Sequence, residues 1–203
     1  MAKALWRYEV HLTPIRVGVP GHRGGNVNYA RVEKDLIRQL KQDRGAYCTT
    51  MLDFYALGKG FPGTSAPPNT SSLDRVRLIE EAVKREIHAK IPEYHPDVRL
   101  IPYLSLHEFE GLLFSDPDAL AQALKAPDRA RRFHEVRNGF PTPEDINDGR
   151  ETAPSKRILS AHPGYKKVIQ GTLAARAVGI DRMRQECGHF RWWVEQLENL
   201  PEL

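Results

Sequence analysis

Two segments of the chain carry apolar residues at intervals of three and four, which is the spacing of an amphipathic helix. The first begins at Tyr29 and would end at Gly45, and the second follows a capping pair formed by Ser71 and Asp74. Their apolar positions are Val32, Leu36, Ile37 and Leu40 in the first, and Leu73, Val76, Ile79, Val83 and Ile87 in the second. The pattern therefore predicts two helices, each with one buried face.

Three other segments are short and rich in apolar, aromatic or β-branched residues, which predicts strands. Residues 5–17 would form one strand that runs into a glycine-rich loop at 18–25. Residues 47–52 and 98–106 would form two buried strands, and the segment 107–114 after them has the pattern of a helix start. Since strands and helices alternate, the expected fold is α/β, with a parallel or mostly parallel sheet flanked by helices.

The last hundred residues have the pattern of helices separated by turns. Apolar residues line one side of the expected terminal helix, and these are Cys187, Phe190, Trp193, Val194 and Leu197. A length of 203 residues fits one ordinary domain. We therefore expect a single domain over residues 1–203, made of an α/β core at 1–125 and a mainly helical part at 126–203 that packs on it.

The composition is that of a folded protein without disulfides or a structural metal. Apolar residues make up 40% and charged residues 28%, with both signs interspersed. Cys48 and Cys187 lie in apolar surroundings far apart in sequence, which predicts two buried free thiols. The formal net charge of +4 permits contact with nucleic acid without requiring it. Because no long apolar run or secretion signal is evident, we expect a cytoplasmic protein with no membrane contact.

Acidic side chains follow both predicted buried strands at their carboxyl ends. Asp53 follows the first strand, and Glu108 and Glu110 follow the second. If the strands are neighbours, these carboxylates would meet where open parallel sheets bind ligands and would hold Mg²⁺ or Mn²⁺. Such a metal would activate water and neutralise charge on a transferring phosphoryl group, with His107 as a base, a ligand or a hydrogen-bonding group. The alternative, that Glu108 caps a helix and Asp53 terminates its strand, stays open at this point.

Basic residues gather around a second candidate site. Ser155 follows a proline at a predicted helix N-terminus, and Lys156, Arg157 and Lys167 lie close by in sequence. Backbone N–H groups, a hydroxyl and cations would together bind phosphate. A capped helix with a solvated basic face is an equally open interpretation. The chain has no Walker motif, paired CxxC, GxSxG or HExxH, which removes several common enzyme classes.

Seven short segments, taken together in their order and spacing, resemble the bacterial DUF4276 proteins over nearly the whole chain. They are residues 49–55, 61–63, 101–103, 107–116, 146–149, 153–157 and 187–190. The family is similar to the Toprim domain of topoisomerases, primases and overcoming-lysogenization-defect nucleases. The resemblance therefore implies a Toprim-like, Rossmann-like fold.

In Toprim domains a glutamate after the first strand and an Asp-x-Asp after a later strand hold Mg²⁺. By this resemblance Asp53 stands for the first aspartate, with Tyr55 at the place of the second. The Phe-Glu-Gly-Leu-Leu element resembles one in Toprim-type defence nucleases, which makes Glu110 a better metal ligand than Glu108. The resemblance thus implies a metal held by Asp53 and Glu110.

The same resemblance implies a Mg²⁺-dependent nuclease that works with a partner ATPase on nucleic acid, in bacterial phage defence or DNA repair. Family members usually begin with a strand that ends in Glu-Gly-x-Thr-Glu, and no such motif stands before Gly18. This departure favours the alternative, a catalytically inactive binding subunit of a multiprotein complex. It also predicts an exposed sheet edge through which the protein would self-associate.

Overall fold

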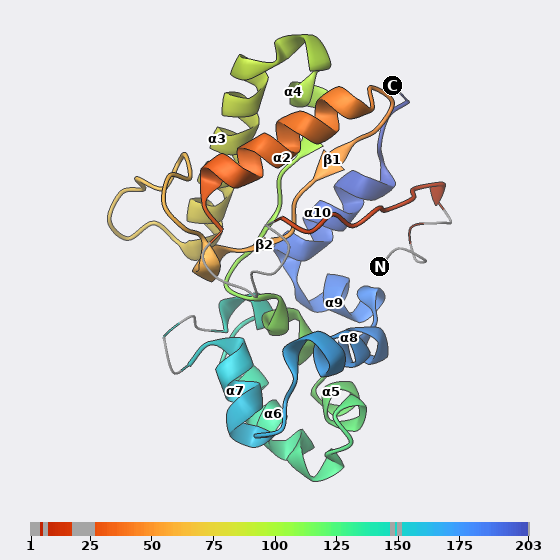
Figure 1. The fold of residues 1–203 in the computed structure, drawn as a ribbon. Helices are drawn as coiled ribbons and strands as arrows, with labels where there is room; N and C mark the ends of the chain where they lie inside the picture. Colours follow the sequence, from red (N-terminus) through yellow and green to blue (C-terminus); the bar gives the residue numbers. More distant parts are fainter. Residues whose placement is uncertain (1–4, 6–7, 18–26, 147–148, 150–151, 203) are drawn as a thin grey trace. The chain divides into compact units, whose positions relative to one another are not determined.

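The computed structural model describes residues 5, 8–17, 27–146, 149 and 152–202, and Figure 1 shows their elements. The chain divides into two compact units. Unit 1 comprises Met1–His11 and His107–Leu200, and unit 2 comprises Leu12–Leu106 and Pro201–Leu203. The main boundary between the units therefore follows the second predicted buried strand, and the single domain stays a prediction.

Unit 2 contains two pairs of parallel strands. Strand β1 (Cys48–Thr49) pairs with β3 (Leu100–Ile101), and β2 (Leu52–Asp53) pairs with β4 (Leu104–Ser105). Cys48 faces Leu100 and Leu52 faces Leu104, so both pairs keep one register. The predicted parallel pairing of the two buried segments is thus confirmed, with an interruption in the middle of each.

The interruption coincides with a proline. Pro102 has no N–H to donate to the neighbouring strand, and the backbone groups of Tyr103 after it bind a side chain instead. The Thr50 hydroxyl donates to the Tyr103 carbonyl oxygen at 2.9 Å and accepts from the Tyr103 N–H at 2.8 Å. The threonine side chain therefore bridges the two segments at the interruption, where the Tyr103 carbonyl oxygen also accepts from the Leu52 N–H at 3.4 Å.

Two helices pack beside these strands (Figure 1). Helix α2 (Tyr29–Gln42) begins after Asn28, whose side chain accepts from the Arg31 N–H at 3.1 Å. Helix α3 (Ser72–Lys90) begins after Ser71, which accepts from the Asp74 N–H and confirms the predicted capping pair. The apolar faces of both helices are buried, as expected, and form one core with the strands. The shorter helices of unit 2 are η2 (Phe54–Ala56), η3 (Pro92–Tyr94) and α4 (Pro96–Arg99).

Unit 1 is helical in its described part, which confirms the predicted helical character of the C-terminal half. Its elements are η4 (Phe109–Ser115), α5 (Pro117–Ala123), η5 (Pro127–Arg129), α6 (Ala130–Asn138), η6 (Pro143–Asp145), α7 (Pro154–Ala161), α8 (Lys167–Val178), α9 (Ile180–Glu186) and α10 (Gly188–Glu198). The 3-10 helix η4 takes the place of the predicted helix start at 107–114. It is buried except at Phe109 and contacts η6 and α5 to α9, so it is the centre of unit 1.

Other predictions for the apolar pattern have mixed outcomes. Helix α10 buries the expected aromatic and aliphatic face, and Cys187 lies buried directly before it. Both cysteines are free, although Cys48 is only half-buried.

The predicted strand at 5–17 is wrong for residues 8–17, which form no strand. Glu9 has a left-handed φ of 59°, and Pro14 lacks an N–H. The predicted loop at 18–25 lies outside the described residues. None of the described helices is long and apolar enough to cross a membrane.

Candidate functional site

A fully buried carboxylate lies at the centre of unit 1. Glu110, in η4, has 0% of its surface exposed. Its Oε2 lies 2.8 Å from the Lys167 Nζ, and its Oε1 accepts a hydrogen bond from the Tyr165 hydroxyl at 3.3 Å. Burial raises the pKa of the Glu110 carboxyl, and the nearby Lys167 ammonium opposes this rise. Glu110, Lys167 and Tyr165 thus form a cluster in which Oε1 accepts a hydrogen bond and Oε2 is held by an ion pair.

Tyr165 connects this cluster to the packing of α8. Burial raises the pKa of its hydroxyl, and the carboxylates of Glu110 and Glu108 raise it further. The tyrosine therefore stays protonated and acts as a hydrogen-bond donor. A Cβ at position 171 would lie 2.8 Å from the Tyr165 Oη, so Gly171 is what lets α8 come this close.

Glu108 holds the N-terminus of α7. Its Oε2 accepts from the Ser155 N–H at 2.9 Å, and Ser155 is the second residue of that helix. A carboxylate at this point satisfies an N–H that the helix cannot satisfy itself and complements the positive end of its dipole. Glu108 therefore caps α7, whereas it makes no side-chain cap of η4, the helix that begins beside it and that its position in the sequence had indicated.

The predicted phosphate ligands all lie in unit 1, and three of them have internal partners. The Ser155 N–H donates to Glu108, and the Lys167 ammonium pairs with Glu110. The Arg157 guanidinium lies 5.1 Å from the centre of the Phe140 ring, and its Nε donates to the Thr152 carbonyl oxygen at 2.6 Å. Lys156 is exposed. Their phosphate-binding role stays a prediction.

Asp53 belongs to unit 2, where it ends β2 beside Ser105, the last residue of β4. Its side chain is half-buried and does not cap the following helix η2. His107 and Glu110 belong to unit 1, and His107 is buried. The convergence of Asp53 and Glu110 on a metal therefore stays a prediction. No group of three or more His, Cys, Asp or Glu side chains within the described ranges is placed to hold a metal ion.

Two further glutamates bind backbone N–H groups and were missed by sequence reasoning. Glu144 accepts from the N–H groups of His189 and Phe190, both at 2.9 Å, and so caps α10. Glu80 in α3 accepts from the Leu104 N–H at 2.7 Å. An acidic residue on the apolar stripe of α3 is a signal that could have identified Glu80. No local signal connects Glu144 to a helix 45 positions later.

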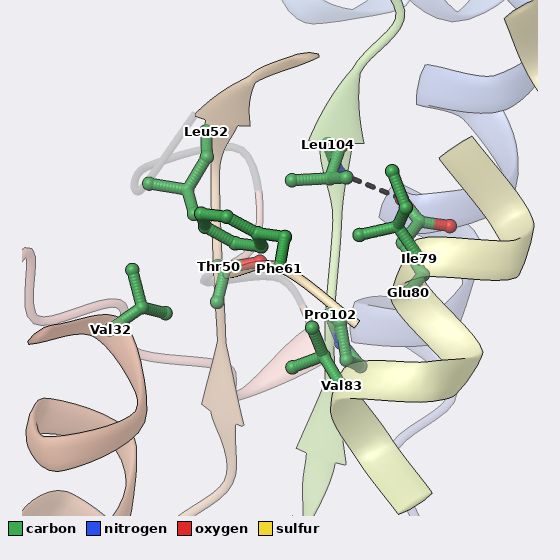
Figure 2. A pocket seen from close by; sticks show the side chains of 9 residues that line it. All are labelled: Val32, Thr50, Leu52, Phe61, Ile79, Glu80, Val83, Pro102 and Leu104. Carbon is green, nitrogen blue, oxygen red and sulfur yellow. Dashed lines mark hydrogen bonds between the residues drawn. The ribbon is translucent and has the colours of Figure 1, made fainter. Parts of the chain in front are cut away.

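A small pocket in unit 2 lies between α2, α3 and the strands, and Figure 2 shows Glu80 reaching from α3 toward Leu104. The cavity has a volume of about 10 Å³. A single buried water needs roughly 10–15 Å³, so there is no room for an organic ligand. Its lining is apolar except at Thr50 and Glu80, and both of these bind backbone groups. The pocket therefore belongs to the packing of the core.

Among the comparisons with known proteins, only the comparison with family models gives a match. Neither the curated proteins nor the solved structures contain a match to this chain. The family model described as "Domain of unknown function (DUF4276)" matches residues 1–198, which is nearly the whole chain. The chain therefore belongs to the DUF4276 family.

Proposed function

We propose that this chain is a non-catalytic binding subunit of a multiprotein complex. The observation that supports the proposal is the state of Glu110, which is fully buried and has both carboxylate oxygens engaged by Lys167 and Tyr165. Mg²⁺ in proteins usually keeps several of its waters and needs accessible oxygen ligands. A carboxylate that is closed off in this way offers such an ion no ligand while Lys167 is in place.

The neighbouring glutamates of unit 1 support the same proposal. Glu108 caps α7 and Glu144 caps α10, so each has backbone N–H groups as partners. Hydrogen bonds from N–H groups to a charged carboxylate stabilise a fold by about 1.5–3 kcal/mol each. Both glutamates therefore have a role in folding that needs no catalytic function.

The proposal is tested by a nuclease assay on the full chain. Plasmid, single-stranded DNA and RNA would be incubated with Mg²⁺ or Mn²⁺, using wild type, Asp53→Asn and Glu110→Gln, with the exposed Glu135→Gln as the matched control. We expect no metal-dependent cleavage by any version. Cleavage by wild type and Glu135→Gln that is lost in Asp53→Asn or Glu110→Gln, with circular dichroism unchanged, would refute the proposal.

The second candidate is a Mg²⁺-dependent nuclease that acts on nucleic acid with a partner ATPase, in bacterial defence or DNA repair. It is favoured by the position of Asp53 and Ser105 at the carboxyl ends of two paired parallel strands, where ligands of open α/β sheets bind. The Ser105 hydroxyl is also buried, and it has no hydrogen-bond partner among the described residues. Loss of cleavage in Asp53→Asn alone would support this candidate.

A further inference from the structure

Helix α8 has two apolar faces, of which unit 1 covers one. The inner face consists of Gly171, Ala174 and Val178, which are buried. The outer face carries larger aliphatic residues: Val168 is 82% exposed, Ile169 62% and Leu173 47%. A surface helix normally turns its larger apolar residues inward and its polar residues to solvent. In α8 the larger apolar residues face solvent and the smaller ones are buried. An exposed apolar patch of this kind is typical of an interaction site.

The stretch of chain that carries this face has charged residues of one sign only. Residues 152–180 contain no Asp or Glu, although the whole chain has 26 acidic residues among 203. The same stretch has basic residues at Lys156, Arg157, Lys166, Lys167 and Arg176. Lys166 precedes the outer face and Arg176 lies near its end, and both are exposed. A partner that covers the face would therefore meet cations at both ends.

We propose that the outer face of α8 docks an acidic amphipathic helix of a partner protein, an inference that rests on the proposed binding function. Val168, Ile169 and Leu173 lie along one side of α8, and the distance from position 168 to Arg176 is about 12 Å at 1.5 Å per residue. A partner helix with aliphatic residues on one side and Asp or Glu at its edges would bury these side chains. Its carboxylates would pair with Lys166 and Arg176.

The structure favours this occupant over the others. A second copy of the chain would bring two basic faces together, which like-charge repulsion opposes. Single-stranded nucleic acid bound without sequence preference is held by cations together with aromatic stacking, and the exposed core of this face is aliphatic. Duplex DNA is held through its phosphates, which make no use of exposed aliphatic side chains. The inner side of α8 packs on α5 and η4, so the outer side is the one that a partner can reach.

The test measures binding of a fluorescent peptide to the full chain by anisotropy. The probe is a 16-residue peptide with leucines at helical spacing and glutamates elsewhere, and a scrambled peptide of the same composition is its control. We expect wild type to bind the amphipathic peptide at least about tenfold more tightly than the scrambled one, which corresponds to about 1.4 kcal/mol. Ile169→Glu should weaken binding by about tenfold or more, and Arg176→Glu by several-fold.

Val98→Glu is the matched control variant, because Val98 is an aliphatic residue of α4 that is 47% exposed. It should leave binding unchanged. Failure of wild type to prefer the amphipathic peptide, or equal binding by Ile169→Glu, would overturn the inference. So would an Ile169-dependent dimer in light scattering, or Ile169-dependent binding to phosphatidylglycerol vesicles or duplex DNA in place of the peptide. None of these measurements involves a metal, so cleavage activity would refute the binding function separately.

Discussion

Removing the charge of Lys167 is the most informative perturbation of the cluster around Glu110. Lys167→Met keeps the aliphatic length of the side chain but leaves the buried carboxylate without its cation. Breaking a fully buried ion pair on one side destabilises a protein by about 3–5 kcal/mol. Because the Lys167 side chain is 51% exposed and partly screened by solvent, we expect a smaller loss of about 2 kcal/mol near pH 8.

This loss should depend on pH, because the Glu110 carboxyl becomes neutral when it takes up a proton. Burial already places its pKa above the ordinary value of 4.5, and removing Lys167 takes away the interaction that lowers it. An acid whose folded-state pKa is raised stabilises the fold at pH values below its unfolded pKa, and this contribution is lost as the pH rises through the folded pKa. The destabilisation by Lys167→Met should therefore be larger at pH 8 than at pH 5.

Urea denaturation at both pH values, followed by circular dichroism, measures the free energies of unfolding. The set of variants is Lys167→Met, Glu110→Gln and the double variant, with exposed Lys166→Met as the control. Glu110→Gln should largely rescue Lys167→Met at pH 8, since the uncompensated charge is then gone. A loss that is the same at both pH values, or a double variant with simply additive losses, would refute the electrostatic explanation of the cluster.

Three further changes test other parts of the structure. Arg99→Met should destabilise the chain by about 3 kcal/mol or more in urea denaturation, because four backbone carbonyls lose a buried guanidinium donor. Gly171→Ala should cost about 1–3 kcal/mol through its clash with the Tyr165 hydroxyl, and the loss should shrink in a Tyr165→Phe background, as a double-mutant cycle would show. Glu144→Ala leaves two N–H groups of α10 unsatisfied, so we expect a loss of about 2–4 kcal/mol and faster hydrogen exchange in α10.

The elements that sequence predicted well are those whose signals are local. The stripe of α3 and its cap at Ser71 lie within a few residues of each other, and both are confirmed. Two apolar runs were enough to predict the parallel strands, but they did not predict the break at Pro102. The expected strand at 5–17 was wrong for residues 8–17, because aromatic and β-branched content does not reveal a left-handed residue such as Glu9.

The same contrast applies to the candidate site, where sequence spacing identified some acidic residues but not their distant partners. Spacing pointed to Glu108 and Glu110, but Glu108 caps the distant helix α7 and not η4, which begins beside it. The partners of Glu110 could not be found in this way, because Tyr165 lies 55 positions away and its role depends on how closely α8 packs. Glu144 is similar, since its two N–H donors belong to a helix that only the fold brings near. An acidic residue can be identified from its place in the sequence pattern, whereas the group that binds its carboxylate cannot.

The segment 107–116, which carries much of the resemblance to DUF4276, has a structural role at each of its acidic positions. Glu108 caps α7, Glu110 pairs with the first residue of α8, and Asp116 caps α5 by accepting from the Ala119 N–H at 2.9 Å. Because η4 lies at the centre of unit 1, these three carboxylates tie three helices to one core segment. Folding accounts for all three acidic residues of this segment. Its resemblance to a nuclease element is therefore weak support for catalysis. Asp53 lies outside this segment and belongs to unit 2, so Asp53→Asn tests a predicted metal ligand separately from these folding roles.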